Sequence, residues 1–221
     1  MRSHLAAMAR ELGRLANSAR VSAPPEDVAE KVGILSRQAC ELLDAHAWSG
    51  PYAVEQLAPP ANRLLVWEPA DLRRTIPYSP VLGDLNPMSG EARVWADGDA
   101  IRGTLRADPI HAGPLGAVHG GVVASVLDEL TSLAVLATGH VGYTKSLTID
   151  YRRPTPLGPA LELWAQTAGI AGGVLLTSAE IRHDGRVTVS AVSVHKAAGR
   201  RDDPIYPADD RDRRSPQRGG T

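Results

Sequence analysis

Residues 119–137 read HGGVVASVLDELTSLAVLA, and this stretch decides the fold. It contains no proline, and beyond its two glycines it is apolar nearly all the way round at helical spacing. Such a pattern predicts a helix that is buried on most sides. A single helix this apolar needs a sheet curled around it to cover its surface.

The segments on either side of this helix alternate as half-buried strands do. Ile101 and Leu105 face one side of a segment whose other side is polar, and Leu147 and Ile149 repeat the pattern later. We predict strands over 92–96, 101–107, 144–152, 160–169, 174–182 and 186–196. The order of two strands, one helix and four antiparallel strands predicts an α+β domain.

The last predicted strand changes its pattern partway. Val187 and Val189 would face one side of the sheet, whereas Val192 and Val194 would face the other. Either a β-bulge or burial of both sheet faces would explain this switch.

The chain divides into four parts by composition and periodicity. Residues 1–46 carry apolar side chains at helical spacing on both sides of a proline pair, which predicts two helices. Residues 47–90 are rich in proline and are predicted to form an irregular connection with one short helix near 69–75. Residues 91–197 hold the strands and the central helix. Residues 198–221 are densely charged, which predicts a disordered tail.

Composition argues against several classes of protein. The 24 basic and 25 acidic residues among 221 leave a net charge of −1, which argues against a nucleic-acid-binding domain. The single cysteine, Cys40, cannot form an internal disulfide or a cysteine-type zinc site. Since no stretch approaches eighteen uninterrupted apolar residues, we expect no membrane span.

The first twenty residues contain four arginines and one acidic residue. This composition is similar to that of an organelle transit peptide. Arginine is frequent throughout the chain, however, so we interpret the segment as an ordinary amphipathic helix and expect a cytoplasmic protein.

The start of the central helix lacks a conventional cap. His119, Gly120 and Gly121 include no Ser, Thr, Asp or Asn, so the first backbone N–H groups of the helix need another partner. Glycine lets a ligand approach the backbone closely, and the helix dipole attracts an anion or a developing oxyanion. A tight chain path beneath a strand would require the same glycines, and the sequence leaves both interpretations open.

Two carboxylates interrupt the apolar helix. Burying an unpaired carboxylate is costly, so at least one of Asp128 and Glu129 should face a cleft or a partner. The two lie about 100° apart around the helix and cannot share one task. Asp128 also lies about 12 Å along the axis from Gly120, so one chain cannot bring both groups to one carbonyl. If both act on a substrate, the site must combine two copies of the chain.

Residues 119–129 resemble the His-Gly-Gly…Asp helix of hotdog-fold acyl-CoA thioesterases, in particular the PaaI-like and thioesterase superfamily member 4 groups. Residues 144–154 resemble the strand that follows that helix, with the same Thr-to-Tyr spacing and basic-Pro ending. The resemblance covers about residues 91–197 and implies a hotdog fold, here with an N-terminal helical extension. It also implies a homodimer or dimer of dimers, an acyl-CoA substrate at the dimer interface, and no cofactor.

The same resemblance implies roles for individual residues. The Gly120 N–H would polarise the thioester carbonyl with help from Gly121, and Asp128 of the other protomer would act as general base or nucleophile. Thr144 matches a position where a hydroxyl orients the attacking water. Strand alternation, however, places Thr144 on the polar face of its strand, so this role requires that face, or the start of the strand, to meet the site.

The remaining candidates have more than one interpretation. His119 is a candidate general base, although a histidine at a helix start more often makes a structural hydrogen bond. Arg152 and Arg153 are candidate ligands for coenzyme A phosphates, or solvated charges at a strand end. Glu129 is a candidate for substrate binding. Some relatives place an Asn six residues before the His, where this chain has Gly113, so one side-chain donor is missing.

Three functions compete on this evidence. The first is an acyl-CoA thioesterase, which hydrolyses a thioester to a free acid and coenzyme A. The second is a hotdog hydratase or dehydratase, but one such signature has a histidine five residues after the aspartate, where this chain has Leu133. The third is a non-catalytic acyl-CoA-binding regulator. The combination of the glycine pair with Asp128 favours the thioesterase. The other histidines lack metal-ligand spacing, so we expect no metal.

Overall fold

The structure is a computed structural model, and it describes residues 2–47 and 66–201. Most of the predicted disordered tail and part of the irregular connection lie outside these residues. The last strand extends to Arg200, so residues 198–200, which the sequence assigned to the tail, belong to the sheet.

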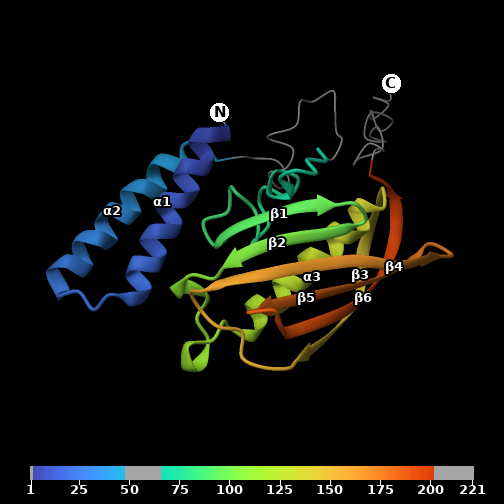
Figure 1. Cartoon of the computed structure of the whole chain (residues 1–221). Coiled ribbons are helices and arrows are strands. Elements are labelled where there is room, and N and C mark those ends of the chain that lie inside the picture. The colour runs from blue at the N-terminus through green and yellow to red at the C-terminus, as the bar shows by residue number, and fades with distance from the viewer. Residues whose placement is uncertain (1, 48–65, 202–221) are drawn as a thin grey trace, which may run out of the picture.

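One sheet of six antiparallel strands wraps around one long helix, α3 (Figure 1). The sheet order is β1-β2-β4-β5-β6-β3, which places β3 at one edge. The elements are β1 (Glu91–Asp97), β2 (Ala100–Arg106), α3 (Gly120–Ala137), β3 (His140–Tyr151), β4 (Ala160–Ala171), β5 (Val174–His183) and β6 (Arg186–Arg200). The predicted α+β hotdog fold is confirmed.

The helix α3 is the core of this domain. Leu127, Leu130 and Leu133 are fully buried between the helix and the concave face of the sheet. Truncating one such leucine to alanine costs about 2–5 kcal/mol, because the lost contacts leave a cavity. Among the described helices, α3 alone has the length and hydropathy of a membrane span, and here the sheet covers it as a core helix.

β6 contains a β-bulge, but it lies at Thr188, before the change from Val189 to Val192, so the bulge does not explain the changed pattern. The register between β5 and β6 shifts between Ile181 and Arg182, opposite Thr188, so Thr188 and Val189 are both buried. Beyond the bulge Val192 lies on the outer face, where it is 51% exposed. The other interpretation, burial of both sheet faces, is therefore also wrong at this position.

The connection before β1 packs tightly although it has little regular structure. Its one short helix is η1 (Leu72–Arg74), within the predicted range 69–75. The Arg73 guanidinium donates to the carbonyl oxygens of Leu82 (2.7 Å) and Ala92 (2.9 Å), and burial lowers its pKa. These bonds fold the segment back on itself and tie it to β1. Two further short helices, η2 (Pro109–His111) and η3 (Pro114–Gly116), lead into α3.

Two N-terminal helices extend the domain, α1 (Arg2–Val21) and α2 (Glu26–Asp44). Helix α1 approaches the domain closely, because a Cβ at Gly13 would lie only 2.5 Å from the Pro87 carbonyl oxygen. Asn17 accepts a hydrogen bond from the Ile110 N–H (3.0 Å), and Arg2 pairs with Asp84 (2.8 Å). Helix α2 lies outside α1 and has no buried residue.

Candidate active site

His119 caps the start of α3 with its own side chain. Its Nδ1 atom accepts a hydrogen bond from the Gly121 N–H at 3.0 Å. The amide of Gly121 is therefore occupied, which argues against its predicted help at a substrate carbonyl. The same bond supports the structural interpretation of His119, because Nδ1 is already an acceptor. No acceptor within the described part of the chain meets the Gly120 N–H.

Tyr151 fixes the other side of the helix start and was not among the predicted site residues. Its hydroxyl donates to the Gly120 carbonyl oxygen at 2.9 Å, and its ring lies beside the Gly120 Cα. The alternation of β3 offered a signal, because Tyr151 shares a face with Ile149, which packs against the core. Tyr151 thus ties the end of β3 to the first turn of α3.

Asp128 and Thr144 meet within one protomer. The Thr144 hydroxyl donates to Asp128 Oδ1 at 3.0 Å. The register between β3 and β6 shifts between Thr144 and Ser146, so Lys145 is an extra residue that reverses the alternation. The bulge turns Thr144 toward α3, and the expectation from strand alternation that it lies on the polar face is wrong.

Glu129 faces a different environment from Asp128. Its Oε2 atom accepts a hydrogen bond from the Ser79 hydroxyl at 2.6 Å, in the segment before β1. Burial raises the pKa of Glu129, and the Ser79 bond partly opposes this shift. The predicted substrate-binding role has no support in this geometry, since the carboxylate joins α3 to the preceding segment.

His195 is a polar residue that the sequence analysis did not select. Its ring is fully buried, and neither ring nitrogen has a hydrogen-bond partner within the described residues. It lies opposite Thr144 in the β3–β6 register. Burial lowers the pKa of His195, and the nearby Asp128 carboxylate opposes this shift. A neutral imidazole therefore lies close to the Asp128–Thr144 pair.

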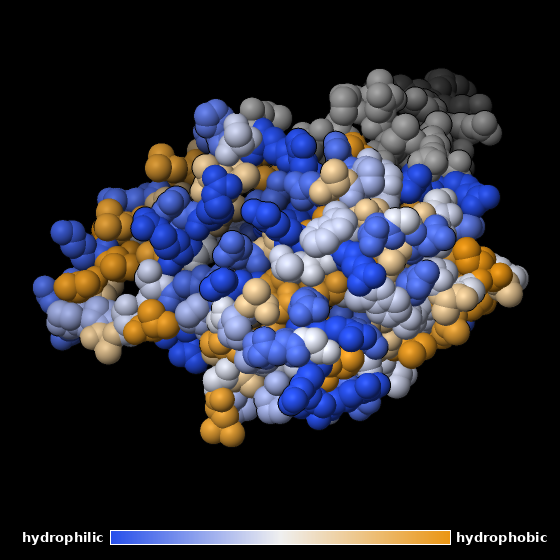
Figure 2. All heavy atoms as spheres, in the orientation of Figure 1, coloured by the Kyte–Doolittle hydropathy of each residue, from blue (hydrophilic) through white to orange (hydrophobic). Residues whose placement is uncertain are grey.

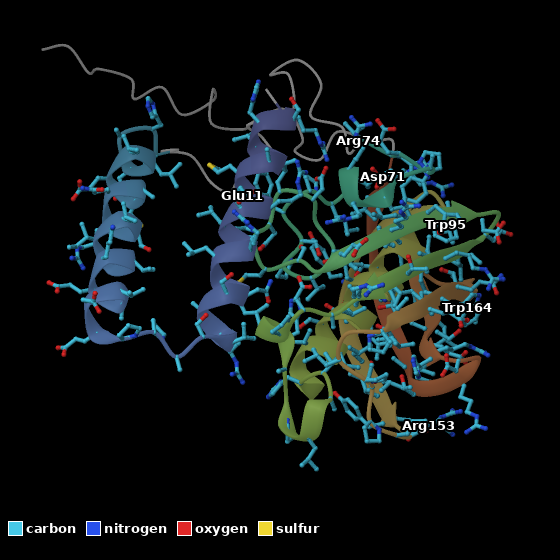
Figure 3. All side chains as sticks on the ribbon, turned by 60° about the vertical axis from the view of Figure 1, so that its left-hand side comes forward. Glu11, Asp71, Arg74, Trp95, Arg153 and Trp164 are labelled. Atoms are coloured by element: carbon cyan, nitrogen blue, oxygen red, sulfur yellow. The ribbon has the colours of Figure 1, made fainter. Side chains whose placement is uncertain are left out.

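The structure separates the two candidate phosphate ligands. Arg152 pairs with Asp150 at 3.0 Å. Arg153 instead lines a surface pocket of about 530 Å³ at the end of the sheet opposite Arg74 (Figure 3). His183, Arg186 and Thr188 also line this pocket, as do Pro154, Pro156 and Asp184.

This pocket adjoins the start of α3. The Val118 N–H donates to the Thr155 carbonyl oxygen at 2.8 Å, and Ala117 forms a β-bridge with Pro156. A cluster of arginine and histidine in a concave site suits a phosphate group.

The missing donor at Gly113 has a steric cause. A Cβ at this position would lie 2.9 Å from the His119 Cα atom, closer than real Cβ atoms approach. The loop therefore passes against the helix start too closely for an asparagine. Among the described residues, no group of three His, Cys, Asp or Glu side chains is placed to hold a metal ion.

Comparison with known proteins shows which family the domain resembles. Residues 115–190 match the model of the thioesterase superfamily, and this match includes α3 and most of the sheet. The hotdog domain of this chain is thus similar to the thioesterase superfamily over residues 115–190. The sequence-based recognition of a hotdog thioesterase is confirmed.

A curated relative is acyl-coenzyme A thioesterase THEM4 of Xenopus laevis, which is 40% identical over 78 residues. The match covers 34% of this chain and 35% of the relative, so the chain spans about a third of that protein's length.

Two solved structures show the same fold. One is a thioesterase superfamily protein with a TM-score of 0.73 and 24% identity, matched over 87% of this chain and 90% of its own. The other is zebrafish thioesterase superfamily member 2, with a TM-score of 0.50 and 17% identity. The match covers 58% of this chain and 94% of the zebrafish chain.

Proposed function

We propose that this protein is an acyl-CoA thioesterase that uses Asp128 as the base or nucleophile. The observation that carries the proposal is the Asp128 carboxylate, held by Thr144 on a mainly apolar helix. The 40% identity with a relative named acyl-coenzyme A thioesterase supports the same class of substrate.

The site combines two protomers. Gly120 and Asp128 lie eight residues apart on the straight helix α3, about 12 Å along its axis. Two antiparallel copies of α3 would bring Gly120 of one protomer to Asp128 of the other. The strand β3 supports this arrangement, since it is a long edge strand whose outer backbone groups are open to pairing with a second copy.

Hydrolysis then proceeds without a cofactor. The Gly120 N–H donates to the thioester carbonyl oxygen and stabilises the negative charge that develops there. Asp128 removes a proton from water as it attacks the carbonyl carbon, or attacks that carbon itself and is released by water. The carbon–sulfur bond breaks, and coenzyme A leaves as a thiolate that takes up a proton. Thr144 fixes the carboxylate for either route.

The Arg153 pocket is the proposed site for phosphate groups of coenzyme A. It adjoins the start of α3, where the thioester carbonyl binds, and it presents Arg153, Arg186 and His183. Arg153→Ala should therefore raise KM for acyl-CoA and leave kcat nearly unchanged. Arg152→Ala is the matched control, because Arg152 pairs with Asp150 and does not line the pocket.

The deciding experiment measures thiol release from a panel of acyl-CoAs, from acetyl to palmitoyl and including phenylacetyl and benzoyl. Asp128→Asn should lower kcat by about 100-fold or more, because general-base catalysis contributes this much. Asp99→Asn, in the exposed turn between β1 and β2, is the control and should match the unaltered protein. Near-normal turnover by Asp128→Asn would contradict the proposed mechanism. Binding of acyl-CoA without thiol release would instead favour a regulator.

A further inference from the structure

The outer helix α2 carries an apolar seam that the described chain leaves largely exposed. The seam consists of Val28, Val32, Leu35, Ala39 and Leu42, at alternating spacings of four and three residues. Leu35 is 56% exposed and Leu42 is 73% exposed. Figure 2 shows apolar side chains at intervals over the two helices at the left of the view. A continuous apolar stripe on an exposed helix indicates an interaction surface.

Helix α1 carries a second seam with the same type of spacing. Leu5, Met8, Leu12 and Leu15 form this α1 seam. The helix docks on the domain through an adjoining face, which includes the buried Ala9 and Gly13, and Leu5 and Leu12 at its border are half-buried. Met8 and Leu15 consequently remain exposed. Both helices of the hairpin therefore present apolar side chains that the chain's own domain leaves uncovered.

The spacing of both seams matches helix-on-helix packing. Apolar residues that alternate at three and four positions form the contact line of coiled coils and helix bundles. The helices have 20 and 19 residues and so are nearly equal in length, about 30 Å, and their seams run for about 15 Å on α1 and about 21 Å on α2. A partner helix pair with the same spacing and length would cover them.

The charges of the two helices are complementary. Helix α1 has four arginines and one glutamate, a net charge of +3. Helix α2 has five acidic residues against Lys31 and Arg37, a net charge of −3. In a two-fold arrangement α1 of one copy would lie against α2 of the other, with opposite charges facing each other. A second copy of this chain satisfies both the apolar spacing and the charge.

We propose that the α1–α2 hairpin pairs with the hairpin of a second copy to form a four-helix bundle. This contact lies on the far side of α1 from the sheet and is separate from the shared active site. It goes beyond the proposed hydrolysis, because it concerns assembly and requires no enzymatic activity.

The test compares full-length variants by sedimentation velocity over a dilution series. Val32→Glu/Leu35→Glu places charge in the α2 seam and should halve the mass of the particle or weaken association at least 10-fold. Ile34→Glu is the matched control, since Ile34 is 40% exposed like Val32 at 38% but lies about 160° from Val32 around the helix. It should retain the mass of the unaltered protein.

A second pair of substitutions separates lost association from lost folding. Val32→Ala/Leu35→Ala preserves helix propensity, so α2 should stay helical by circular dichroism while association weakens. Equal mass and equal concentration dependence for all variants would overturn the proposal. Binding to phosphatidylserine vesicles that only the seam variants lose, with unchanged mass, would also overturn it and assign the seam to a membrane surface.

Discussion

At the scale of single residues, the proposed oxyanion role of the Gly120 N–H can be tested by a substitution that removes only this backbone donor. Gly120 is the first residue of α3, where proline is tolerated because the helix needs no N–H there. His119 has the extended backbone that precedes proline, with ψ at 133°. Gly120→Pro should therefore keep the fold and lower kcat about 100- to 1,000-fold, as loss of an oxyanion donor does.

Gly120→Ala is the control for this substitution. It retains the N–H, and its Cβ would lie 3.6 Å from the Tyr151 ring, an ordinary contact distance. Its kcat should stay within a few-fold of the unaltered value. Steady-state thiol release and thermal unfolding of both variants check the prediction, and equal kcat for the two variants would contradict it.

His195 gives a second prediction at this scale, on stability against pH. Because burial lowers the pKa of His195, the folded protein keeps the ring neutral, whereas the unfolded chain protonates it below about pH 6.5. Stability from this group is therefore fully present above that pH and is lost as the pH falls toward the folded pKa. His195→Leu should abolish this loss of folding stability at low pH. It should also raise the free energy of unfolding by about 1–3 kcal/mol, because it removes the buried ring nitrogens that have no hydrogen-bond partner within the described residues.

Urea unfolding at pH 8 and pH 5 measures both effects. His195→Leu should be the more stable protein at pH 8, and its advantage should widen at pH 5. A variant that is less stable at both pH values would show that the buried ring has a stabilising partner.

At the scale of secondary-structure elements, periodicity predicts the main parts of the fold. The apolar stretch that became α3 and the alternating strands around it are regular patterns, so they are visible in the sequence. Contacts that depend on a break in the pattern are not. The extra residue Lys145 turns Thr144 toward Asp128, and alternation alone predicts the opposite.

Long-range polar contacts were equally hidden from the sequence. Ser79 lies 50 positions before Glu129 in a segment with no periodicity, so nothing local indicates their hydrogen bond. His195 occupies a position where alternation calls for an apolar side chain, and this conflict with the pattern was its only signal. A structural hydrogen bond was one interpretation of His119, but its role as N-cap for the Gly121 N–H was not predicted, because histidine is not a common N-cap residue.

The contact between α3 and the segment before β1 leads to a prediction about these elements. Ser79→Ala removes the hydrogen bond that lowers the pKa of Glu129, and the free energy of unfolding at pH 8 should fall by about 1–3 kcal/mol. Since the folded pKa of Glu129 is raised, acidification favours the folded state, and the deficit should shrink toward pH 5.

Unfolding by urea at the two pH values measures this deficit. Adding Glu129→Gln to Ser79→Ala supplies the control, because a neutral amide removes the unpaired charge and should recover part of the loss at pH 8. A deficit that is equal at both pH values, with no recovery in the double variant, would contradict the role of the Glu129 charge.

At the scale of the whole molecule, the position of the candidate groups predicts that the proposed hydrolysis requires two copies of the chain. Each protomer supplies an Asp128–Thr144 pair and, about 12 Å away along α3, a Gly120 amide. If the sites are shared, Asp128→Asn and Gly120→Pro should each be inactive as homodimers. A mixed dimer would hold one intact site, with Gly120 from the first variant and Asp128 from the second.

Mixing the two inactive variants in equal amounts, with exchange of subunits, should therefore restore activity. Random pairing makes half of the dimers mixed, and each mixed dimer has one working site of two, so about a quarter of the unaltered activity should return. Differently tagged variants allow the mixed dimer to be purified and its thiol release measured directly. A purified mixed dimer with no activity would show that Gly120 and Asp128 of different protomers do not act on the same thioester.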